Sequence, residues 1–143
     1  MNDKWDWRFL NLAHHVSLWS KDPSTKVGCV LVDPRRVVIG IGYNGFPRGV
    51  NDYDERLADR AVKYQMVQHA EANAVLNASA SPRGATAFVT HPPCANCAGL
   101  LIQAGIARIV TTAPGEGLAE RFKDSFASAR IMCAEAGVEY LEL

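Results

Sequence analysis

The sequence predicts a three-layer α-β-α domain of the α/β class with a five-stranded mixed sheet. Short β-branched runs recur along the chain, a tight turn joins the first two, and helical segments alternate with the others. Right-handed crossovers between the later strands would make the last three strands parallel. A length of 143 residues is usual for one domain, so we expect a single domain over residues 1–143.

The first half of the chain combines a helix with a hairpin. Apolar residues recur at steps of three and four over residues 3–19, which predicts an amphipathic helix. Two β-branched runs at 27–32 and 37–43 flank the turn-forming residues 33–36, a pattern typical of a β-hairpin. Glycines and a proline over residues 44–51 indicate a loop.

Helices and strands alternate in the rest of the chain. Their bounds are marked by Gly and Pro and by the change between apolar periodicities. In chain order we expect helices over 54–67 and 69–78, a strand over 85–90, a helix over 94–104, a strand over 106–112, a helix over 118–136 closed by Gly137, and a strand over 138–143.

The charges of the chain balance, with 15 Lys and Arg against 15 Asp and Glu. A partner that is a nucleic acid polymer would normally require a basic excess, so this class is disfavoured. The first residues are polar and acidic, unlike a signal peptide, and no apolar run approaches the ~20 residues that span a membrane. We therefore expect a soluble, cytoplasmic protein without a membrane partner.

One group of residues predicts a metal site. Cys94 and Cys97 lie three apart at the start of a predicted helix, so both sulfurs share one face, and the helix N-terminus favours the thiolate form. A lone C-x-x-C could also be a redox pair, but His69 starts another helix and could add a nitrogen ligand. One nitrogen and two thiolates leave a tetrahedral zinc with the open position typical of catalytic sites. Glu71 could then exchange protons with a water on the metal.

The remaining cysteines and the tryptophans have plainer interpretations. Cys29 lies in a predicted strand and Cys133 on the apolar side of the last helix, so both are expected to be buried free thiols. Trp5, Trp7 and Trp19 could pack against the core or against a partner, and core packing is favoured.

The pattern H-x-E…P-C-x-x-C is the signature of zinc deaminases of nucleobases. Beyond it, the chain resembles the deoxycytidylate (dCMP) deaminases from about Trp5 to Val138. The resemblance is carried by Ser-Lys-Asp-Pro-Ser-Thr-Lys-Val-Gly (20–28), Gly-Tyr-Asn-Gly-Phe-Pro-Arg-Gly (42–49), Lys-Tyr (63–64), His-Ala-Glu-Ala-Asn-Ala (69–74) and Leu-Ile-Gln-Ala-Gly-Ile (101–106). It implies a cytidine-deaminase-like fold.

The resemblance also implies an activity, the hydrolytic deamination of dCMP to dUMP and ammonia, which would supply dUMP for dTMP synthesis. By resemblance, zinc is held by His69, Cys94 and Cys97, and Glu71 is the proton shuttle. Asn44 matches the residue that contacts the nucleotide sugar, and the backbone of Ala70 the group that meets the base.

Phosphate and effector sites are less specified. Ser24, Thr25 and Lys26 lie in a turn before the first strand and could donate to the substrate phosphate, although a solvated turn is equally compatible with them. The resemblance implies an effector site at which dCTP activates the enzyme and dTTP inhibits it, with Mg²⁺. Arg48 could contribute to this site, or it could equally be a surface charge. Relatives are usually hexamers, so we expect a homo-oligomer.

One position departs from the family pattern, in which an aromatic residue commonly precedes Pro-Cys. Here Pro92 precedes Pro93 and Cys94. This difference leaves the base preference open, including whether the enzyme accepts a 5-substituted cytosine. Alternatives to dCMP are therefore a nucleoside, another cytosine substrate or a tRNA adenosine. A non-catalytic zinc-binding module is a further alternative, against which Glu71 argues.

Overall fold

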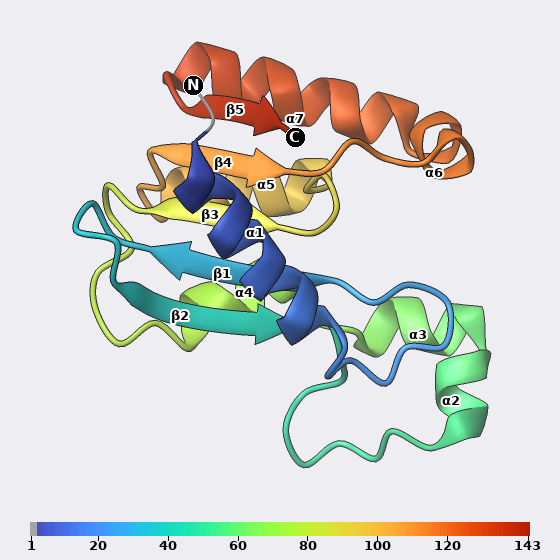
Figure 1. Cartoon of the computed structure of the whole chain (residues 1–143). Helices are drawn as coiled ribbons and strands as arrows, with labels where there is room; N and C mark the ends of the chain where they lie inside the picture. The colour runs from blue at the N-terminus through green and yellow to red at the C-terminus, as the bar shows by residue number, and fades with distance from the viewer. Residues whose placement is uncertain (1–2) are drawn as a thin grey trace.

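The computed structural model describes residues 3–143, which build a five-stranded sheet in the order β2-β1-β3-β4-β5 (Figure 1). The strands are β1 (Gly28–Val32), β2 (Val38–Tyr43), β3 (Thr86–Val89), β4 (Arg108–Thr111) and β5 (Glu139–Glu142). β1 pairs antiparallel with both β2 and β3, whereas β3–β4 and β4–β5 are parallel. The mixed sheet, the hairpin and the three parallel strands predicted from the sequence are confirmed.

One face of the sheet is covered by α1 (Lys4–Ser17), which crosses in front of the strands in Figure 1. Asp3 caps the start of this helix, and its carboxylate accepts hydrogen bonds from the backbone N–H groups of Trp5 and Asp6. Its fully buried stripe of Leu10, Ala13 and Val16 packs on the strand residues Val30, Val32, Phe88 and Val110. This packing forms the first of two apolar layers.

The opposite face is covered by α4 (Ala70–Leu76), α5 (Ala95–Gln103) and α7 (Lys123–Ala136). Cys29 and Cys133 are fully buried in this second layer and form no disulfide, as the sequence predicts. The three layers of the predicted fold are therefore present.

Two helices expected to be continuous are each broken in the structure. Residues 54–67 form α2 (Asp54–Ala58) and α3 (Arg60–Met66), because Asp59 is extended and its carboxylate caps the second helix through the N–H groups of residues 61 and 62. The last helix is divided at Phe122 into α6 (Glu116–Arg121) and α7. Figure 1 shows α3 and α6 beyond the same end of the sheet.

The prediction that the tryptophans pack in the core is wrong for Trp7 and Trp19, which are 47% and 49% exposed. The buried stripe of α1 runs through position 6, where the Asp6 carboxylate is paired with Arg108. Trp7 is thereby turned to solvent, and Trp19 lies beyond the end of the helix, edge-on to Tyr43 with ring centroids 6.1 Å apart. Within residues 3–143, no helix has the length and apolar content needed to cross a membrane.

Candidate metal centre and active site

The three candidate metal ligands lie at the beginnings of two neighbouring helices. His69 directly precedes α4, Cys94 directly precedes α5, and Cys97 lies in the first turn of α5. Their ligand atoms all lie within 4.8 Å of one another. His69 Nδ1 is 3.2 Å from Cys97 Sγ and 3.7 Å from Cys94 Sγ. The fold therefore converges one nitrogen and two sulfurs from residues up to 28 positions apart.

These distances fit a tetrahedral zinc ion. With bonds of about 2.3 Å to sulfur and about 2.0 Å to nitrogen, a tetrahedral ion holds nitrogen and sulfur ligands about 3.5 Å apart. The hydrogen bond from the Cys97 thiol lowers the pKa of the Cys94 thiol to about 4, and the same contact raises the pKa of Cys97. Zinc replaces such shared protons, because the thiolate is the form that binds metal. Three protein ligands leave one position of a tetrahedron open.

Glu71 lies two residues after His69, in the first turn of α4, and its side chain is only 4% exposed. Burial raises the pKa of this carboxyl to about 7. Glu71, His69 and Cys94 line one pocket. A proton-accepting group therefore lies beside the three candidate metal ligands and is not itself a ligand.

The start of α4 is held unusually close to strand β2. A Cβ atom on Gly42 would stand 2.3 Å from the Ala74 nitrogen and 2.4 Å from the Ala70 carbonyl oxygen. Only glycine permits this approach at position 42. The helix that carries Glu71 is thereby fixed against the sheet.

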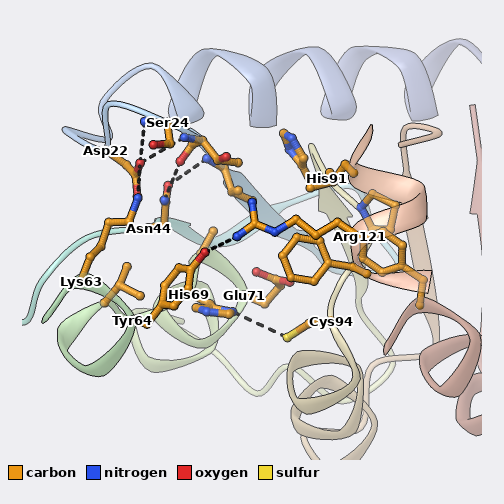
Figure 2. Close-up of a pocket in the computed structure, with 18 of the residues that line it drawn as sticks. Asp22, Ser24, Asn44, Lys63, Tyr64, His69, Glu71, His91, Cys94 and Arg121 are labelled. Carbon is orange, nitrogen blue, oxygen red and sulfur yellow. Dashed lines mark hydrogen bonds and ion pairs between the residues drawn. The ribbon is translucent and has the colours of Figure 1, made fainter. Parts of the chain in front are cut away.

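The pocket has a volume of about 210 Å³. Figure 2 shows its labelled side chains converging from different elements of the fold. The lining residues are Asp22, Ser24, Thr25, Val27, Asn44, Arg60, Lys63, Tyr64, Val67, His69, Ala70, Glu71, His91, Pro92, Cys94, Leu118, Arg121, Phe122 and Phe126.

A buried ion pair organises the turn that contains Ser24 and Thr25. Asp22 Oδ1 accepts from the Ser24 N–H at 2.8 Å and the Thr25 N–H at 3.1 Å, and Lys63 Nζ lies 3.2 Å from the same oxygen. Burial would raise the pKa of Asp22, but these N–H groups and the Lys63 ammonium together hold it below its usual value. Both side chains are less than one tenth exposed.

Asn44 links this turn to strand β1. Its side-chain oxygen accepts from the Val27 N–H at 2.8 Å, and its amide nitrogen donates to the Thr25 carbonyl at 2.9 Å. The amide is buried, and its second N–H donates to no group among residues 3–143. Asn44 and Ala70 both line the pocket, as the expectation for them requires.

Two other expected residues lie outside the pocket lining. The Lys26 ammonium donates to the Ser20 carbonyl. Arg48 Nη2 donates to Asn77 Oδ1 at 3.3 Å on an exposed surface. Their expected roles stay predictions.

Several pocket residues were not singled out as site residues from the sequence. The cations Arg60, Lys63 and Arg121, together with Tyr64 and Phe126, come from helices whose position depends on the tertiary fold, and Phe122 comes from the break between α6 and α7. The Lys63–Tyr64 pair carried part of the family resemblance and was the one available signal. Pro92 is buried and lines the pocket, so it does form part of a wall near Glu71.

Comparison with known proteins identifies the family. Residues 3–113 match the model of the cytidine and deoxycytidylate deaminase zinc-binding region. The chain belongs to this family. It is 40% identical over 139 residues to an uncharacterized deaminase in the luxG 3′ region of Aliivibrio fischeri, covering 97% of this chain and 93% of that protein. It is also 36% identical to the deoxycytidylate deaminase of Mus musculus, over 96% of this chain and 78% of the mouse protein.

Solved structures show the same fold. The dCMP deaminase of cyanophage S-TIM5, in complex with dCMP and dUMP, superimposes with a TM-score of 0.78 at 24% identity, over 100% of this chain and 99% of the phage chain. The metal that this zinc-binding deaminase family implies is zinc, and the His-Cys-Cys cluster fits it.

Proposed function

We propose that this chain catalyses the hydrolytic deamination of dCMP to dUMP and ammonia. The observation that carries the proposal is the meeting of the His69, Cys94 and Cys97 donors with the buried carboxyl of Glu71 in one pocket. Relatives named deoxycytidylate deaminase, 34% and 36% identical over 96% of this chain, support dCMP as the substrate.

His69, Cys94 and Cys97 would hold the zinc ion. When bound, zinc is a Lewis acid that makes water a nucleophile at neutral pH. Cys97 is buried, whereas His69 is accessible from the pocket. The open side of the donor set therefore faces the space in which a cytosine ring would lie.

Glu71 would move the protons of the reaction. Its carboxylate takes a proton from the attacking water, delivers it to N3 of the ring, and assists the departure of the amine from C4 as ammonia. Its burial and its place in the first turn of α4 keep it directed at the pocket. Water adds to C4 and ammonia leaves, so the atoms of dCMP and water equal those of dUMP and ammonia.

The rest of the pocket would bind the nucleotide. We assign the base to the backbone of Ala70 and the sugar to Asn44, whose amide is already oriented by Val27 and Thr25. Ser24 and Thr25 are the candidate hydroxyl donors to the phosphate. Lys26 joins them only if its ammonium leaves the Ser20 carbonyl.

Regulation and assembly follow from family resemblance alone. An effector site for dCTP and dTTP with Mg²⁺, including Arg48, stays a prediction, as do the hexameric state and the cytoplasmic location. Arg48 lies outside the pocket lining, which is compatible with a separate effector site.

A substrate panel tests the proposal. Zinc-loaded protein is assayed for ammonia release from dCMP, CMP, deoxycytidine, cytosine and 5-methyl-dCMP, with and without dCTP or dTTP. We expect dCMP to have the highest kcat/KM. The 5-methyl-dCMP arm examines the wall that Pro92 forms. Intact dCMP together with turnover of cytosine or deoxycytidine would contradict the proposal.

A further inference from the structure

Two side chains outside the zinc motif meet across the pocket. Arg121 is the last residue of α6, and Tyr64 lies in α3. Arg121 Nη2 donates to the Tyr64 hydroxyl at 2.5 Å. Figure 2 shows the Arg121 side chain extending from its helix across the pocket to this hydroxyl. Arg121 is thereby held over the same space that His69 and Glu71 line.

The charges that line the pocket do not balance among themselves. Lys63 is neutralised by Asp22 in the buried ion pair. Arg60 and Arg121 also line the pocket, and among residues 3–143 neither has an acidic partner within ion-pair distance. Two guanidinium groups are thus available for an anion from solution. A phosphomonoester, with close to two negative charges at neutral pH, matches them.

Ser24 lies on the side of the pocket toward which the Arg121 guanidinium points (Figure 2), and Thr25 follows it in the same turn. Asp22 holds the backbone N–H groups of Ser24 and Thr25, so the turn is fixed. Within the described part of the chain, the hydroxyls of Ser24 and Thr25 form no hydrogen bond. A guanidinium and two hydroxyls therefore line the same pocket from different elements, an arrangement suited to the several oxygens of a phosphate.

We propose that Arg121 is a specificity-determining residue that binds the 5′-phosphate of a nucleoside monophosphate opposite the Ser24 and Thr25 hydroxyls. This inference rests on the proposed function and names the group by which the pocket distinguishes a nucleotide from a nucleoside. The family match ends at residue 113, so Arg121 lies outside the region that the match covers. Tyr64 is a positioning residue, because it acts by holding the guanidinium.

The test measures binding of the product, so that it does not depend on turnover. Affinities of zinc-loaded protein for dUMP and for deoxyuridine are determined by calorimetry, and the quantity compared is their ratio. We expect the wild-type chain to prefer dUMP. Arg121→Gln should reduce the preference by about 10- to 100-fold, the range for loss of charge-assisted hydrogen bonds.

Three further variants separate charge, geometry and position. Arg121→Lys should recover part of the preference, because an ammonium supplies charge without the planar fork. Tyr64→Phe should reduce the preference about 3- to 10-fold, since one neutral hydrogen bond is lost. Lys123→Gln removes a positive charge from an exposed residue two positions after Arg121 and outside the pocket lining, and it should leave the preference unchanged.

An unchanged ratio in Arg121→Gln, or an equal loss of both ligands, would overturn the inference, as would a wild-type chain that binds dUMP and deoxyuridine equally. Turnover of dCMP by the wild-type chain is measured separately. If dCMP is deaminated while the Arg121→Gln ratio is unchanged, the inference fails and the proposed function stands. If the ratio falls while dCMP is not deaminated, the phosphate site stands and the proposed reaction fails.

Discussion

Gly42 and Ala70 touch so closely that strand β2 and helix α4 are in direct backbone contact at the edge of the active site. A side chain on Gly42 would stand 2.4 Å from the Ala70 carbonyl oxygen, well inside any normal contact distance. The same helix turn carries Glu71, so the absence of a side chain at one strand position controls where the proposed proton shuttle lies.

Gly42→Ala should therefore affect both stability and activity. The added methyl group must displace backbone atoms of α4, and overpacking of this kind costs typically about 1–3 kcal/mol of unfolding free energy. The free energy of unfolding, measured with urea, and kcat would both fall. Gly45→Ala is the matched control, because a Cβ there meets no atom within 4 Å. Equal stability of the two variants would show that α4 shifts freely.

Glu71→Gln should abolish most of the activity without loss of metal. The amide keeps the size of the side chain but cannot take a proton, and general acid–base groups contribute about 10²- to 10⁴-fold to rate. We expect at least a 10²-fold decrease in kcat for ammonia release, with zinc content by elemental analysis unchanged. Glu135→Gln, on an exposed position of α7, should behave as wild type. Full activity of Glu71→Gln would remove Glu71 from the mechanism.

Lys63→Met should be strongly destabilising. Removal of the ammonium leaves the buried Asp22 carboxylate without its charge partner, and breaking a buried pair in this way costs about 3–5 kcal/mol. Lys21→Met removes a lysine from a comparable pair, 3.1 Å from Asp52, whose side chains are 70% and 41% exposed. Exposed pairs contribute about 0–1 kcal/mol. Chemical denaturation of both variants should reveal this difference, and equal losses would argue against it.

Asp6 gives a prediction about pH. Hydrogen bonding to Arg108, at 2.6 and 2.7 Å, lowers the pKa of this buried carboxyl in the folded chain. A lowered folded pKa means that the carboxylate stabilises the fold at pH values above the unfolded pKa of about 3.9, and that this stabilisation is lost as pH falls through the folded value. The difference in unfolding free energy between wild type and Asp6→Asn should be constant near neutrality and shrink below about pH 4. A difference that grows with acidification would contradict this assignment.

The sheet and the metal ligands could be predicted because their signals are local. β-branched runs between turns mark strands, and the spacing of His69, Cys94 and Cys97 predicts ligands at helix starts, with Glu71 two residues after the first of them. The structure brings these residues together because β2 and β3 both run antiparallel to β1 and therefore end at the same edge of the sheet, where α4 and α5 begin.

Other parts depend on tertiary contacts that no local pattern reports. Asp59 has the residue type of a helix cap, but a polar helix that continues through it has the same periodicity. The break at Phe122 is marked by neither Gly nor Pro. Arg121 was not predicted to be in the site, since its approach to Tyr64 joins residues 57 positions apart. Lys26 was expected at the site from its sequence neighbours, yet its ammonium donates to the Ser20 carbonyl.

The break at Phe122 separates a helix whose residues pack in the core from a helix whose residues do not. Helix α7 buries Phe126, Ala129 and Cys133, so its sequence is limited by the core. Helix α6 buries none of its six residues, yet it carries Leu118 and Arg121 to the pocket. Substitutions in α6 can therefore alter the pocket lining while leaving the core and the three metal ligands unchanged. Related deaminases could acquire different substrate preferences through changes in this short helix alone, with the same metal ligands and the same catalytic carboxyl.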